Sequence, residues 1–104
     1  MIDNKIVTLK TVEKYISLTE EARRKATPFE LNEDNSEKLS SMMRMCDDYL
    51  SDAKYFMNKG DLVRAFGAIN YAHAWIDAAV KIGFMDGQGD ENPQKALVGE
   101  GLQD

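Results

Sequence analysis

The chain lacks several features that define common protein classes. It holds 104 residues but a single cysteine, Cys46, so no disulfide can form within it. This cysteine usage fits a reducing compartment and excludes a disulfide scaffold. The most apolar window, residues 65–80, is interrupted by Asn70, His73 and Asp77, and it falls short of the ~18 apolar residues of a membrane span. With no secretion signal visible either, the sequence predicts a cytoplasmic protein without a membrane partner.

The sequence also lacks the short motifs that mark common catalytic sites. No glycine-rich phosphate loop stands before an expected helix, and no nucleophile elbow is present. The chain has one histidine, so a zinc site would need Cys46 and scattered acids as further ligands. We therefore expect no metal and no cofactor, and the sequence favours a protein that is not an enzyme.

The net charge of −5 is unevenly distributed along the chain. From Asp86 onwards there are five acids and one base, Lys95, so this segment carries most of the negative charge. The rest, residues 1–85, is nearly neutral and is poorly suited to neutralising phosphates. Its one basic run, residues 23–25, is short and has no interleaved aromatic residues. We expect no nucleic-acid partner.

The spacing of apolar residues predicts two helices in the first half. Positions three and four apart are apolar over residues 5–26, and Pro28 ends that helix. Ser36 is a suitable cap for a second helix over residues 37–59, with Glu37 in its first turn. The wide apolar stripe of this helix predicts packing against two partners. It comprises Leu39, Met42, Met43, Cys46, Tyr49, Leu50, Ala53, Phe56 and Met57.

A third helix is predicted over residues 62–82. Gly60 is suited to a left-handed cap and Asp61 to the next N-cap, so the second and third helices form an antiparallel hairpin. Gly83 ends the third helix, with Phe84 folding back on its last turn. The predicted fold is an all-α, antiparallel up-down-up three-helix bundle over residues 1–85, followed by an acidic, disordered tail over residues 86–104.

The third helix and its boundaries carry one further pattern, which is Gly60-Asp61, Ala65, Tyr71-Ala72, Trp75-Ile76-Asp77-Ala78 and Gly83. With these residues the chain resembles a family of small archaeal proteins, the domain of unknown function numbered 357. The resemblance covers residues 10–86 and rests mainly on the third helix. It implies a compact helical bundle. It implies no catalytic residues, because the family has no established activity.

His73 and Asp77 are the candidates for chemistry, because a spacing of four puts them on one face of a helix. They could be a general base with its orienting carboxylate, or two ligands of a metal. The other interpretation is a core histidine hydrogen-bonded to a carboxylate one turn away, which the apolar surroundings of His73 favour. Cys46 is expected to be buried, and the acidic turn at Asp47, Asp48 and Asp52 to be a solvated face that pairs with the basic end of the first helix.

The second and third helices have more apolar circumference than a three-helix bundle can bury. Leftover apolar surface usually means a partner, so the sequence favours a non-catalytic module that associates with itself or with another protein. The expected interaction surface comprises Met45, Tyr55, Tyr71 and Trp75. The alternative is a small enzyme, or a nucleotide- or RNA-processing domain, centred on His73 and Asp77.

Overall fold

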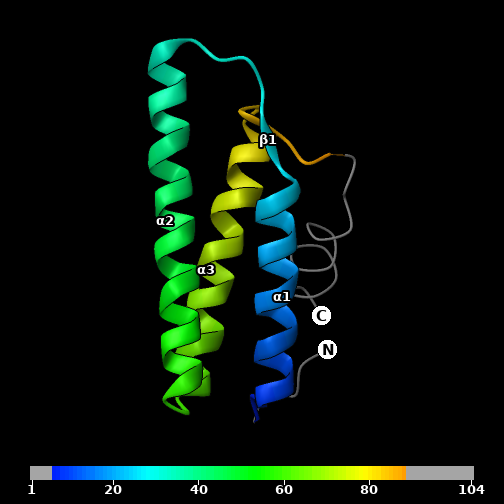
Figure 1. The fold of residues 1–104 in the computed structure, drawn as a ribbon, viewed down its shortest axis with the longest axis vertical. Coiled ribbons are helices and arrows are strands. Elements are labelled where there is room, and N and C mark those ends of the chain that lie inside the picture. The colour runs from blue at the N-terminus through cyan, green and yellow to red at the C-terminus, as the bar shows by residue number, and fades with distance from the viewer. Residues whose placement is uncertain (1–5, 89–104) are drawn as a thin grey trace.

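The computed structural model describes residues 6–88, which form three helices and one short strand pair (Figure 1). The helices are α1 (Leu9–Lys25), α2 (Glu33–Asn58) and α3 (Leu62–Lys81), and the strands are β1 (Thr27–Pro28) and β2 (Met85–Asp86). In Figure 1, α1 and α3 run in one direction and α2 in the other. The predicted all-α three-helix bundle is confirmed. The predicted disordered tail begins too early, because its first residue, Asp86, belongs to β2, and from residue 89 onwards it lies outside the described residues.

The starts of α1 and α2 differ from the prediction, because residues other than the expected ones cap them. α1 begins at Leu9 and not near residue 5, since Oγ1 of Thr8 accepts a hydrogen bond from the Thr11 backbone N–H at 3.1 Å. α2 begins at Glu33, where Oδ1 of Asn32 accepts from the Asn35 N–H at 2.7 Å. The prediction of a cap at Ser36 is therefore wrong by about one turn. Ser36 lies inside the helix.

The ends of α2 and α3 follow the prediction. At each end a glycine has a left-handed backbone, with φ of 80° at Gly60 and 86° at Gly83. The Gly60 N–H donates to the Met57 carbonyl and the Asp61 N–H to the Phe56 carbonyl, which is the Schellman pattern. The same two bonds recur at the end of α3, where Phe84 donates to Ala79 at 2.9 Å. Both predicted glycine caps are confirmed.

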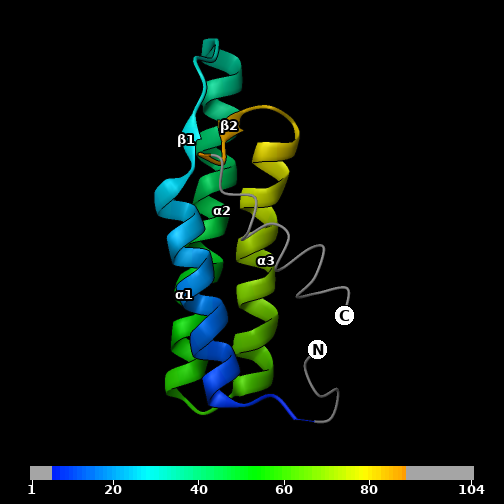
Figure 2. The ribbon, with the colours of Figure 1, turned by 90° about the vertical axis from the view of Figure 1, so that its right-hand side faces the viewer.

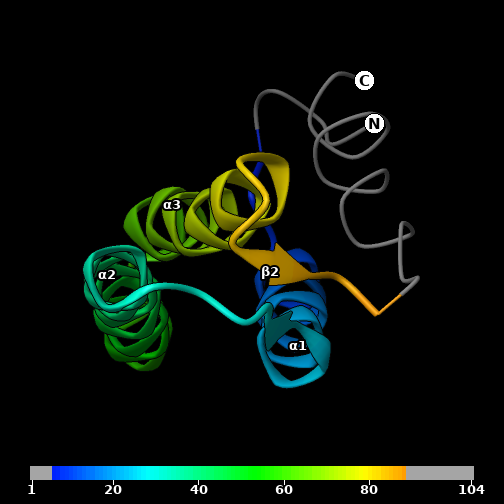
Figure 3. The same ribbon diagram turned by 90° about the horizontal axis from the view of Figure 1, so that it is seen from above.

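Seen along the bundle, the three helices occupy the corners of a triangle (Figure 3). The contact between α2 and α3 is the most extensive, and α1 packs more on α3 than on α2. Small residues of α3 allow this close packing. Those buried are Ala65, Ala68, Ala72 and Ala79. The third helix is therefore the central element that its composition predicts.

The strand pair is a feature that the sequence pattern does not predict. β1 and β2 pair antiparallel, Thr27 with Asp86 and Pro28 with Met85, beside the ends of α1 and α3 (Figure 2). The Phe29 N–H extends the pairing by donating to the Phe84 carbonyl at 3.0 Å. The pairing places Met85 in the core. The chain after α3 is thereby held against the start of the α1–α2 connection.

Candidate functional site

His73 lies in the interface between α1 and α3 and is 1% exposed. Its Nδ1 is 3.0 Å from Oγ1 of Thr19, a fully buried residue of α1, and the tautomer of the ring decides which of the two donates. The prediction of a core histidine is confirmed. Its hydrogen-bond partner is on another helix, however, and not one turn away on α3.

Asp77 follows His73 by one turn but makes no hydrogen bond to it. Its Oδ1 is 3.6 Å from His73 Nε2, which is beyond hydrogen-bond distance. Both carboxylate oxygens are shielded from solvent and have no hydrogen-bond partner among the described residues. Burial raises the pKa of Asp77 to about 7, because a desolvated carboxyl favours its neutral form. Oδ1 of Asn70, on the same face of α3, is buried in the same way.

This arrangement limits what the pair can do chemically. A general base must come within hydrogen-bond distance of the proton that it abstracts, and the His73 ring is covered by α1. Within residues 6–88, no three His, Cys, Asp or Glu side chains gather closely enough to hold a metal ion. Thr19 and His73 thus form a buried polar contact between α1 and α3, and Asp77 lies beside His73 on α3.

Cys46 is buried in the stripe by which α2 packs on the bundle. Desolvation, together with the negative charge of Asp47, raises the pKa of its thiol to about 11. A nucleophilic cysteine needs the opposite shift and an accessible sulfur. The prediction of a buried cysteine is confirmed.

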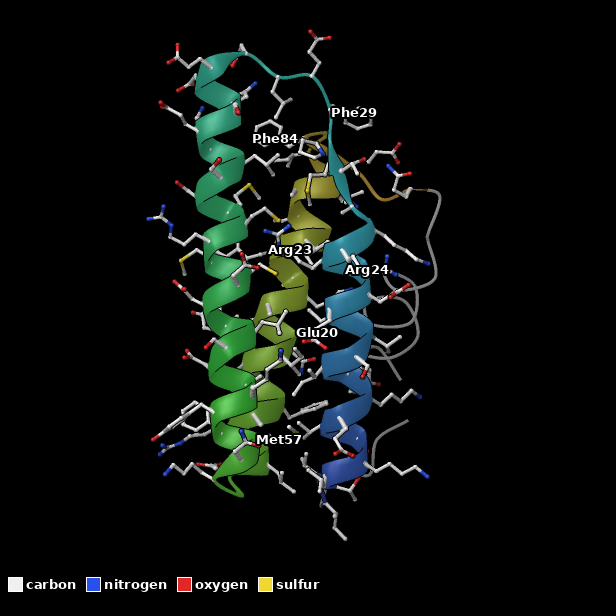
Figure 4. All side chains as sticks on the ribbon, viewed as in Figure 1. Glu20, Arg23, Arg24, Phe29, Met57 and Phe84 are labelled. Atoms are coloured by element: carbon white, nitrogen blue, oxygen red, sulfur yellow. The ribbon has the colours of Figure 1, made fainter. Side chains whose placement is uncertain are left out.

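Two ion pairs join α1 to α2. Arg23 donates from Nε and Nη2 to the two carboxylate oxygens of Asp47 at 2.9 and 3.1 Å, and Lys54 of α2 pairs with Glu20 of α1. Figure 4 shows Glu20 and Arg23 on the side of α1 that faces α2. The predicted pairing between the basic end of the first helix and the acidic turn of the second is confirmed at Asp47.

Apolar side chains remain exposed on the α2–α3 hairpin, and two ring contacts fix their register. The rings of Tyr49 and Tyr71 stack with centroids 5.2 Å apart. Nearer the turn, the Arg64 guanidinium lies 5.8 Å from the centre of the Phe56 ring. Both pairs fit one antiparallel register, in which residue numbers on α2 rise as those on α3 fall.

This register places Met45, one turn before Tyr49, level with Trp75, one turn after Tyr71. We call the resulting surface the α2–α3 strip. It comprises Met42, Met45, Tyr49 and Phe56 of α2, Tyr71 and Trp75 of α3, and Ile82 at the C-cap of α3, of which Met45, Tyr71 and Ile82 are exposed and the others half-buried. His73, which contacts Thr19 of α1, marks the side of α3 that faces α1. This side is about 160° around the helix from Trp75.

The strip contains three of the four predicted interaction residues. Tyr55 is the exception, although it is 59% exposed. It lies six residues after Tyr49, so its side chain points about 120° further around α2, where its ring meets Phe56 edge-on and lies under Lys59. The sequence pattern assigns Tyr49 to the buried stripe. Only its stacking on Tyr71 reveals it as part of the strip.

No helix among the described residues is long and apolar enough to cross a membrane. Comparisons with curated proteins and with solved structures found no match. The family model described as "Protein of unknown function (DUF357)" matches residues 14–85. The match runs from α1 to the first residue of β2 and therefore includes α2, α3 and both glycine caps. Because it spans more than half of the chain, the chain belongs to the DUF357 family.

Proposed function

We propose that the chain is a non-catalytic helical module that works in the cytoplasm by associating with protein, and that the α2–α3 strip is its docking surface. The observation that carries the proposal is the row of exposed and half-buried aromatic and methionine side chains along two helices, with Tyr49 and Tyr71 stacked within it. Tyrosine, tryptophan and methionine are enriched at the centres of protein interfaces, and a continuous exposed apolar surface is uncommon on monomers.

The strip is also preorganised, which favours binding. Its side chains stand on helices that pack closely on each other, and the Tyr71 ring is held against Tyr49. Side chains that are already ordered lose little conformational entropy when a partner covers them. Exposed charges stand at both ends of the strip, so a partner can be selected by charge as well as by shape.

The second candidate function is an enzyme centred on His73 and Asp77. It is favoured by one observation, the pKa of about 7 at Asp77, which suits proton transfer near neutral pH. It requires that His73 become accessible, because the ring is 1% exposed. Rapid modification of His73 by diethyl pyrocarbonate in the native protein would support the enzyme, whereas modification only on unfolding would count against it.

Site-specific photo-crosslinking tests the docking surface. A benzophenone amino acid is placed at Tyr71 in cells that produce the protein, and at Tyr55 as the matched control. The two tyrosines have nearly equal exposure, 61% and 59%, but Tyr71 lies in the middle of the strip, whereas Tyr55 touches the strip only at Phe56 and points away from it. We expect cross-linked protein from position 71 and little from position 55. Equal yields from both positions, or none from either, would contradict the proposal.

A further inference from the structure

We infer that the partner on the α2–α3 strip is a second copy of this chain, packed antiparallel about a two-fold axis that passes near Met45 and Trp75. The inference rests on the proposed function, since it takes the strip to be an interface. It goes beyond that function by naming the occupant and its orientation.

The order of charges along the strip carries the inference. Asp34, Lys38, Met45 and Asp52 follow one another at spacings that keep them on the same side of α2. The next position along that side is Phe56, which is covered by the Arg64 guanidinium. Read from the start of α2 towards the turn, these four charges are negative at Asp34, positive at Lys38, negative at Asp52 and positive at Arg64, with Met45 between the two pairs.

An antiparallel copy brings opposite charges together along this surface. Lys38 is seven residues before Met45 and Asp52 seven after it, so each lies about 10 Å along the helix from the proposed axis. In the antiparallel dimer, Lys38 of each copy therefore faces Asp52 of the other copy, which gives two such pairs. Asp34 and the Phe56–Arg64 level are each eleven residues from Met45, so Arg64 meets Asp34. A parallel copy would instead oppose like charges, which is strongly unfavourable.

The ion pairs within one chain do not prevent this exchange. Lys38 is 3.1 Å from Asp34 and Arg64 is 3.4 Å from Asp61, and all of these side chains except that of Asp61 are largely solvated. Such pairs contribute little, so they are readily replaced by contacts across an interface. The centre of the interface would then be Met45 and Trp75 with Tyr49 and Tyr71, an apolar cluster ringed by charge, as in the interfaces of two-fold dimers.

Sedimentation equilibrium with a charge swap tests the inference. We expect the native chain to dimerise, and Asp52→Lys to raise the dissociation constant about tenfold, because two pairs of like charge then face each other. Lys38→Asp should have a similar effect, and the double variant should restore dimerisation. Glu13→Lys is the control, since it makes the same charge change at an exposed position of α1, away from the strip. Thermal melting followed by circular dichroism checks that every variant folds.

The outcomes separate this inference from the proposed function. If the native chain stays monomeric and position 71 cross-links to a different protein, the partner is not a second copy. The strip is then still a docking surface. A monomer without cross-links at position 71 overturns both. If Asp52→Lys leaves the dissociation constant of the dimer unchanged, or if the double variant does not restore dimerisation, the antiparallel arrangement is wrong.

Discussion

At the scale of single residues, the most unusual feature is the buried carboxyl of Asp77. The sequence shows that His73 and Asp77 share a helix face, and the apolar stripe around His73 correctly indicates a core position. It cannot show that Thr19 supplies the hydrogen bond to His73, because these residues are 54 positions apart and meet only when α1 packs on α3. Thr19 is also an unremarkable member of the apolar stripe of α1.

The burial of Asp77 predicts a specific dependence of stability on pH. Its pKa in the folded protein, about 7, lies above the ordinary value of 3.8, so the folded chain holds this proton more tightly than the unfolded chain. The resulting stabilisation is complete below pH 3.8 and is lost as the pH rises through 7. The variant Asp77→Asn lacks this titration. The free energy of unfolding of the variant minus that of the native chain should therefore increase by roughly 2–3 kcal/mol as the pH is raised from 5 to 8.

Urea unfolding of both proteins at pH 5, 6, 7 and 8 measures this difference. The buried amide of the variant contributes a constant offset, so the slope of the difference with pH is the diagnostic quantity. Asp48→Asn, at an exposed position of α2, is the control for the carboxyl-to-amide change itself. A downward slope would mean that an ion pair with His73, and not desolvation, dominates at Asp77.

At the scale of the elements, the C-terminal ends of the helices were predictable and the N-terminal ends less so. A glycine in a left-handed conformation is a local requirement, so Gly60 and Gly83 identify both endings directly. The start of α2 offers two suitable caps, Asn32 and Ser36, and the local sequence does not rank them. Asn32 prevails because the helix then gains an additional turn with Glu33 and Asp34 at its positive end.

Alanine substitution should have opposite effects at two glycines. At Gly60 the φ of 80° disfavours any side chain, so Gly60→Ala should lower the free energy of unfolding by about 1–2 kcal/mol. Gly67 is within α3, and an added Cβ there meets nothing within 4 Å, so Gly67→Ala should raise it by about 0.5–1 kcal/mol. Chemical denaturation of the two variants beside the native protein gives both values. Two changes of the same sign would contradict this account of the two glycines.

At the scale of the whole molecule, the sequence predicts surplus apolar surface but not its position. Which face of the hairpin stays open depends on where α1 docks, and the stripes of α2 and α3 are too wide to decide this. The pairing of Tyr49 with Tyr71 then places the strip, and it separates Tyr71 from Tyr55, which the sequence treats alike. The strand pair could not be predicted, because strands of two residues are too short to produce a periodic pattern in the sequence.

The uneven packing predicts that α1 opens before the rest of the bundle. α1 makes fewer contacts than the α2–α3 hairpin, and its ion pairs to α2 are partly solvated. Native-state hydrogen exchange should therefore give lower opening free energies for the amides of α1 than for those of α2 and α3. Equal values in all three helices would indicate one cooperative unit. The amides of Ala65 and Ile69, in the middle of the hairpin core, are suitable references.

The strand pair between β1 and β2 also determines how the molecule responds to mechanical force. Thr27 pairs with Asp86, so residues 27–86 form a loop whose two ends are clasped together. A pull applied at residues 26 and 87 reaches both strands from the same side, because these residues adjoin the same pair, Thr27 with Asp86. The α2–α3 hairpin lies between the two strands in the sequence, so such a pull loads the strand pair before it loads the hairpin. The fold thus places its most extensively packed pair of helices behind the strand pair.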